Sequence, residues 1–227
     1  MILNLQYFGG RGASADGGLS DGPTGGGRGN GETKYGQPNT PLVPPAPTIE
    51  MQIGQKGKAI SANEAIKTIN PDRDVEWGDY SENCQRCVVA YELNRRGYRV
   101  EASETGPNDI YPVAGNWMRA FKNAKETLVG ARTNDKVNKN ILSNMKEWGN
   151  GSRAIVEVVY PGGRTGHVFN VEYTGGKLRY YDAQTGDKYD PKRVFNHVVK
   201  ERVSIVRSDN LALNDDVRNM VRKKRAK

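Results

Sequence analysis

Apolar residues are densest between residues 150 and 210, in short runs typical of strands. Residues 153–160 are mostly β-branched or apolar, which is the composition of a buried strand. Residues 167–173 and 178–183 form two further runs, and Gly175-Gly176 between them suits a two-residue hairpin turn. Residues 203–206 form a closing run. The pattern predicts an antiparallel sheet in this half of the chain.

The segment before the sheet has helical periodicity. In residues 80–96, one helical face carries residues at i, i+3, i+4 and i+7, namely Cys84, Cys87, Val88 and Tyr91. Ser81 is the expected N-cap, and Glu82 places a favourable negative charge in the first turn. Gly97 is the expected end of this helix.

Other helices are predicted over residues 116–126 and 135–148, and shorter ones begin at Asp190 and Asn214. Helices followed by an antiparallel sheet indicate the α+β class. His197, in the short helix after Asp190, is expected to pack or to face solvent rather than to act as a base.

The N-terminal quarter has a different composition. Residues 9–36 are rich in Gly, Ser, Asp and Asn, and residues 38–47 are rich in Pro. Neither segment can bury enough apolar surface to offset the entropy of ordering. We expect a flexible linker over residues 9–58, preceded by an apolar docking peptide at residues 1–8. The expected organisation is a tail (1–58), a catalytic domain (59–208) and a basic C-terminal helix or tail (209–227).

The formal net charge of +8 favours an acidic partner, either a nucleic acid or an anionic protein. The most basic segment, residues 222–227, has no interleaved aromatic residue that could stack on bases, so a solvated terminus is expected and nucleic acid stays a candidate partner. Residues 1–8 are too short for a membrane span and lack a basic n-region, so no membrane partner is expected.

The 227-residue chain has two cysteines and two histidines. A thiol becomes a strong nucleophile when an imidazole takes its proton and a third group orients the ring. The hairpin turn would pair Phe169 with Asp182 and His167 with Gln184. His167 and Asp182 then emerge on the same face of the sheet as diagonal neighbours, about 7–8 Å apart at the backbone.

Cys84 is the preferred nucleophile because it lies in the first turn of its helix, where free N–H groups favour a thiolate. Cys87 lies one turn deeper and is assigned to the core or to a supporting role, although the choice between the two cysteines stays partly open. A thioredoxin-like redox pair would need a preceding strand. A structural zinc site would need four ligands, and His167 and His197 have no finger-like spacing. No metal or cofactor is expected.

Together, the motifs Asn-Cys-x-x-Cys at residue 83, Gly-His-x-x-Asn at residue 166 and Asp-x-Gln-Thr-Gly at residue 182 resemble the papain-fold toxin domains. These are glutamine deamidases of bacterial polymorphic toxins and some phage-encoded proteins, and the similarity covers residues 77–206. The resemblance implies a papain-like cysteine fold with Cys84 as nucleophile, His167 as general base and Asp182 as its orienting group. Four further motif positions have supporting roles: Gln184, Asn170, Cys87 and Asn83.

The same resemblance implies a protein substrate and an immunity or inhibitor protein as partners. The first dozen residues resemble those of phage head-associated proteins, which suggests that residues 1–8 dock to a phage head or capsid protein. The expected location is a phage virion or a reducing bacterial cytoplasm, with a secreted effector as a further option. Two alternatives share the residues: a papain-like cysteine protease, and a non-catalytic virion component that keeps the fold.

Overall fold

The computed structural model describes residues 6–7, 48–74, 80–106 and 113–225. The linker expected over residues 9–47, and most of the docking peptide, lie outside the described residues. Within that peptide, the two-residue strand β1 (Gln6–Tyr7) pairs antiparallel with β5.

An antiparallel sheet of seven strands organises the fold, as the apolar runs predict. Six strands lie in the order β3-β8-β4-β5-β6-β7, and β1 pairs with β5 off this path. Their bounds are β3 Thr127–Leu128, β8 Ser204–Arg207, β4 Arg153–Val159, β5 Thr165–Thr174, β6 Lys177–Asp182 and β7 Asp187–Tyr189.

The β5–β6 hairpin has the register expected from its Gly-Gly turn. The ladder runs from Thr174 opposite Lys177 to Asn170 opposite Tyr181, and there it ends. The two further pairs expected from the sequence, Phe169–Asp182 and His167–Gln184, are not part of the ladder. Asp182 pairs instead with Asp187 of β7. The two strands of the hairpin are therefore unpaired with each other next to His167.

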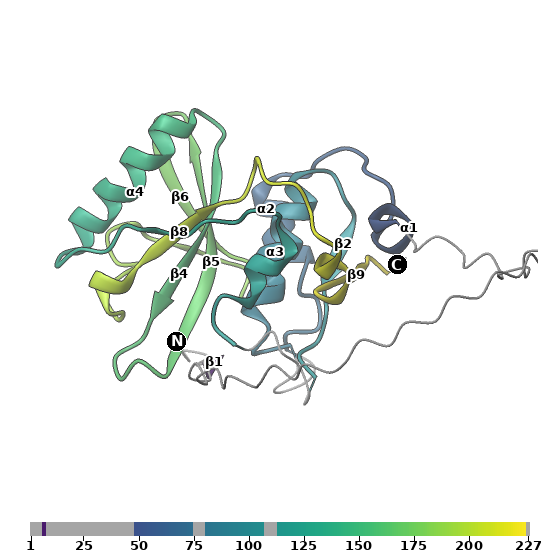
Figure 1. Ribbon diagram of the computed structural model, residues 1–227, viewed down its shortest axis with the longest axis horizontal. Coiled ribbons are helices and arrows are strands. Elements are labelled where there is room, and N and C mark those ends of the chain that lie inside the picture. The colour runs from purple at the N-terminus through teal and green to yellow at the C-terminus, as the bar shows by residue number, and fades with distance from the viewer. Residues whose placement is uncertain (1–5, 8–47, 75–79, 107–112, 226–227) are drawn as a thin grey trace, which may run out of the picture. The chain divides into compact units, whose positions relative to one another are not determined.

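Helices cover both faces of the sheet (Figure 1). Helix α4 (Asn134–Trp148) lies on one face, and α2 (Ala62–Thr68) and α3 (Cys84–Arg95) lie on the other. The alternation along β4 sets the division, because Val156 belongs to the core under α4 and Ile155 to the core under α3. Two apolar cores therefore hold three layers together, and the sheet contributes to both.

Helix α3 begins later than the sequence predicts. Asn83, and not Ser81, is its N-cap residue, so Glu82 lies outside the first turn. The Asn83 side chain does not cap the helix because it bonds Asn70 instead. The predicted end is confirmed: the helix stops before Gly97, which has a φ of 103°.

Two predicted helices are wrong. Residues 116–126 contain only the 3-10 helix η1 (Asn116–Ala120), because Phe121 turns into extended backbone and bridges to Leu213. Residues 191–197 form successive turns, within which Phe195 is buried and His197 is exposed. The following 3-10 helix is η2 (Lys200–Arg202).

The C-terminal segment, expected as a basic helix or tail, is helical only in its first part, which begins after Asn214 as predicted. The chain forms the 3-10 helix η3 (Asp215–Asn219) and then strand β9 (Val221–Lys223), which pairs with β2 (Val100–Ala102). Arg222 and Arg225 both bind the carboxylates of Asp72 and Glu101. These basic residues therefore form ion pairs within the folded domain. Their partners are distant in the sequence, so the local charge pattern could not reveal them.

Residues 48–58, assigned to the linker from sequence, include helix α1 (Ile49–Ile53). The Thr48 side chain caps it by accepting a hydrogen bond from the Met51 N–H at 3.3 Å. Ile53 is only 2% exposed, and the helix contacts β9 and η3. A helix of one and a half turns is too short to show apolar periodicity, which is why the sequence did not reveal it.

Two truncations test whether residues 1–47 and helix α1 contribute to the stability of the fold. A chain starting at Thr48 should melt within a few degrees of the full-length protein. A chain starting at Ala59 loses the burial of Ile53, about 1.5–3 kcal/mol, so its melting temperature should fall by about 4–10 °C. Thermal unfolding followed by circular dichroism measures this. Met51→Ser is the control, because Met51 is 68% exposed on the same helix. Equal melting temperatures for the two truncations would show that α1 adds nothing to the fold.

Candidate active site

His167 and Asp182 form a buried pair. Nε2 of His167 lies 2.9 Å from Oδ2 of Asp182, and the two residues are 5% and 1% exposed. His167 comes from β5 and Asp182 from the end of β6, beyond the last ladder pair of the hairpin. The side chains thus connect the two strands where backbone pairing between them has stopped.

Asp182 accepts hydrogen bonds from several groups besides the imidazole. The backbone N–H groups of Gln184 and Thr185 donate to Oδ1 at 2.9 and 3.4 Å, and the Tyr189 hydroxyl donates to Oδ2. Burial alone would raise the pKa of Asp182, but the His167 charge and these hydrogen bonds hold it below its usual value. The carboxylate is therefore ionised and fixed in orientation.

The environment of His167 favours its charged form. Burial lowers the pKa of His167, but the charge and hydrogen bond of Asp182, together with the interaction with Cys84, raise it well above the usual value. The other ring nitrogen, Nδ1, is buried and has no hydrogen bond of regular geometry with any described group. The Cys84 thiol acts on the ring through both a hydrogen bond and its charge, and both raise the pKa of His167.

Cys84 is the first residue of α3 and is fully buried. The loop after β6 holds this end of the helix: the Gln184 side chain donates to the Ser81 carbonyl, and Asn70 donates to the Gln184 carbonyl at 3.1 Å. These bonds keep the N-terminus of α3 at the unpaired end of the β5–β6 hairpin, within electrostatic range of His167.

Cys87 is held differently from Cys84. Its thiol donates to Oδ1 of Asn83 at 3.1 Å. Burial, followed by the charges of Cys84 and Asp182, raises the pKa of the Cys87 thiol well above its usual value. Asn83 is 1% exposed and also donates to Asn70 and to the Ser103 carbonyl, both at 3.1 Å. Cys87 is therefore a protonated thiol in a polar network beneath the start of the helix.

The two remaining motif residues link the sheet to α3. The Gln184 side chain is 2% exposed, and its Oε1 atom has no hydrogen-bond partner among the described residues. Asn170 donates from Nδ2 to the Val88 carbonyl of α3 at 3.3 Å. Both side chains hold α3 against the strands that carry His167 and Asp182.

Sequence reasoning missed three residues around this site. Tyr189 contacts Asp182 from β7, a three-residue strand with no recognisable pattern. Asn70 bonds Asn83 from the end of α2, and only the fold brings them together. Gly186 has a φ of 83°, and a Cβ there would lie 2.3 Å from Nη1 of Arg73. The glycine of the Asp-x-Gln-Thr-Gly motif was the one available signal for this close approach.

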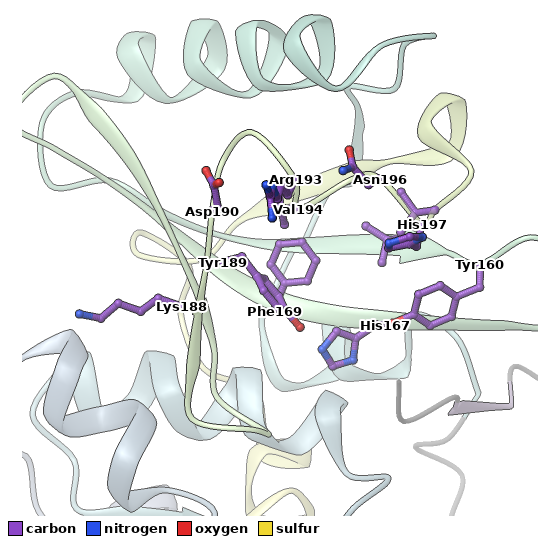
Figure 2. Close-up of a pocket in the computed structure, with 12 residues that line it drawn as sticks. Tyr160, His167, Phe169, Lys188, Tyr189, Asp190, Arg193, Val194, Asn196 and His197 are labelled. Carbon is purple, nitrogen blue, oxygen red and sulfur yellow. The ribbon is translucent and has the colours of Figure 1, made fainter. Parts of the chain in front are cut away.

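A cavity of about 670 Å³, here called the His167 pocket, opens beside this pair. It is lined by Val158, Tyr160, His167, Phe169, Lys188, Tyr189, Asp190, Arg193, Val194, Asn196, His197 and Val198. Figure 2 shows the rings of His167 and Tyr160 close together at one end, with Lys188 at the other. Burial raises the pKa of Tyr160, and the charges of His167 and Cys84 also act on it. This end of the pocket therefore lies against His167, while Cys84 and Asp182 are not among its lining residues.

Among the residues that the structure describes, no group of three or more His, Cys, Asp and Glu side chains could hold a metal ion. In the same part of the chain, no helix has the length and apolarity of a membrane span.

Part of this chain is similar to known proteins. Residues 82–187 match the family model described as papain fold toxin 1, glutamine deamidase. The solved structure of the Salmonella effector SpvD, G161 variant, is similar with a TM-score of 0.42 and 17% identity, covering 67% of this chain and 80% of that one. No curated protein matches.

The pH dependence of stability tests the buried pair. The raised pKa of His167 contributes stability that is complete below the unfolded value, about 6.5, and is lost as pH rises through the folded value. The lowered pKa of Asp182 contributes stability above about pH 4 that is lost on acidification. Asp182→Asn should therefore cost on the order of 1.5–3 kcal/mol at pH 5.5 and less at pH 9.5.

Urea unfolding at the two pH values measures this difference. Asp187→Asn is the matched control, because it removes an exposed carboxylate from the residue that pairs with Asp182 across β6 and β7. An equal loss for Asp182→Asn at both pH values would mean that no charged pair forms.

Proposed function

We propose that the papain-fold toxin domain at residues 82–187 is a cysteine-dependent amidohydrolase that deamidates glutamine side chains of a protein substrate. The observation that carries the proposal is the position of His167, held by Asp182 on one ring nitrogen and within range of Cys84 on the other side. The family description supports deamidation over peptide cleavage.

Cys84 is proposed as the nucleophile and Cys87 as a supporting residue. The Cys87 thiol donates its proton to Asn83, and its raised pKa keeps it protonated and unreactive. Cys84 is the cysteine whose interaction with the imidazole contributes to the raised pKa of His167. This difference favours Cys84 as the thiol that exchanges a proton with His167.

The reaction proceeds in two halves. The Cys84 thiolate attacks the side-chain carbonyl carbon of glutamine and forms a C–S bond, which gives a tetrahedral oxyanion. The intermediate collapses, the C–N bond breaks, and His167 donates its proton so that ammonia leaves and a thioester remains. His167 then takes a proton from water, whose oxygen attacks the thioester. Breaking the C–S bond releases glutamate and restores the thiolate.

Backbone N–H groups at the start of α3 are the proposed oxyanion donors. The N–H groups of Arg86 and Cys87 are occupied, because both donate to the Asn83 carbonyl at 2.9 and 3.0 Å. The N–H groups of the first two helical residues, Cys84 and Gln85, have no intrahelical acceptor and point out of the helix end. They lie beside the thiol, where the oxyanion forms.

The proposed partners are a protein substrate and an immunity or inhibitor protein, as suits a toxin domain. Docking of residues 1–8 to a phage head protein stays a prediction, because residues 1–5 and 8 lie outside the described part.

Thiol labelling tests the choice of nucleophile. Iodoacetamide at pH 7 should alkylate Cys84 faster than Cys87, because of the two thiols only that of Cys84 interacts with the His167 imidazole. Peptide mapping by mass spectrometry locates the label. Cys84→Ser should abolish the fast reaction, while Cys87→Ser should keep it and mainly lower the melting temperature. Fast labelling of Cys87 alone would reverse the assignment.

The reaction itself is tested by incubating the protein with bacterial and eukaryotic lysates. Deamidation should appear as ammonia release and a gain of one dalton at glutamine residues. Cys84→Ala and His167→Ala should each lower the rate about a thousandfold or more, since both act directly in the chemistry. New N-termini without deamidated glutamine would identify a protease instead.

A further inference from the structure

The His167 pocket is larger than its proposed target needs. Its volume of about 670 Å³ lies in the range of sites that hold drug-sized ligands, about 300–1,000 Å³. A single glutamine side chain fills only a small part of that space. The pocket can therefore accept residues of the substrate that flank the glutamine.

The floor of the pocket is apolar. Val158, Phe169 and Val198 are all buried, and the partly buried Val194 lies beside them. Phe169 is also in edge contact with Tyr189, with ring centroids 5.2 Å apart. A floor of this kind favours a large aliphatic or aromatic side chain, because burying one removes its apolar surface from water.

The rim of the pocket is cationic. Lys188 and Arg193 are exposed, and in the described part of the chain neither side chain forms an ion pair. Asp190 also lines the pocket, but among the described residues its carboxylate forms no ion pair with Lys188 or Arg193. Its Oδ1 accepts a hydrogen bond from the Lys192 N–H at 2.9 Å. Other basic residues, such as Arg222 and Arg225, are paired with carboxylates. Lys188 and Arg193 are therefore available to bind an anionic group of a partner.

We infer that the His167 pocket binds the segment of the substrate protein that flanks the target glutamine, with an apolar side chain on the floor and an acidic side chain against Lys188 and Arg193. The inference rests on the proposed function and names its substrate class: glutamine within an acidic, apolar-anchored segment. A protein segment fits better than a nucleic acid, because the floor is made of valines and Phe169 and the rim has few cations.

Three synthetic nonapeptides with one central glutamine test this. One flanks the glutamine with Leu and Glu, one with Leu and Lys, and one with Ser and Glu. Turnover by the full-length protein is followed by the one-dalton mass gain. Binding of fluorescent peptides to the Cys84→Ala variant is followed by anisotropy. The Leu/Glu peptide should be deamidated and bound at least about tenfold better than the other two.

Reversing the charge of Lys188 and Arg193 tests whether these two residues cause the preference for acidic flanking residues. The double variant Lys188→Glu, Arg193→Glu should raise KM and Kd for the Leu/Glu peptide about tenfold and reverse the preference for acidic flanks. Lys192→Glu is the matched control, because Lys192 is an exposed neighbour that lines a different cavity. It should leave both constants within twofold. Melting temperatures of all variants report whether they are folded.

Four other results would contradict the proposed specificity or the proposed reaction. Equal binding of the three peptides, or an effect of Lys192→Glu as large as that of the double variant, would overturn the inference. The inference would also be overturned, in favour of a nucleic acid, by a fluorescent single-stranded oligonucleotide that binds more tightly than any of the peptides. In that case the double variant should no longer bind the oligonucleotide. Charge-dependent peptide binding without ammonia release would support the pocket and refute the proposed deamidation.

Discussion

Helix α3 is buried on every side, and the rest of the structure depends on satisfying its polar groups. Every residue from Cys84 to Asn94 is buried. Gln85 donates to the Val113 carbonyl and accepts from the Trp117 N–H, and Glu92 binds Arg96 and Arg153 at 2.7 and 2.8 Å. An unpaired buried polar group costs about 1–3 kcal/mol, so each partner element has to be in place for the helix to be stable.

The same constraint positions the candidate site. Because α3 is fixed along its length, its first residue is fixed relative to the sheet, and Cys84 meets His167 without any contact of its own with solvent. The polar network of Asn70, Asn83 and Gln184 closes the gap between the helix start and the end of β6. Rigid support of this kind fixes the thiol and the imidazole in orientation relative to each other.

The sequence predicts those features whose signals are local. The Gly175-Gly176 turn sets the register of the hairpin as far as Asn170 and Tyr181, and beyond the ladder the His167–Asp182 side-chain bond joins the two strands. Features that depend on distant partners could not be predicted. The Asn83 side chain bonds Asn70 in place of the helix end that it precedes, and β9 exists because it pairs with β2. The contact of Tyr189 with Asp182 depends on the path of a three-residue strand.

The buried contacts of Glu92 constrain which substitutions the chain can accept. It is fully buried, and besides its two arginines it accepts a hydrogen bond from Ser208 at 3.1 Å, so one carboxylate joins α3, β4 and the segment after β8. Losing the carboxylate alone would leave two guanidinium groups without their counter-charge. Substitutions at positions 92, 96 and 153 should therefore be coupled in descent, and divergent relatives should exchange this charged junction as a unit.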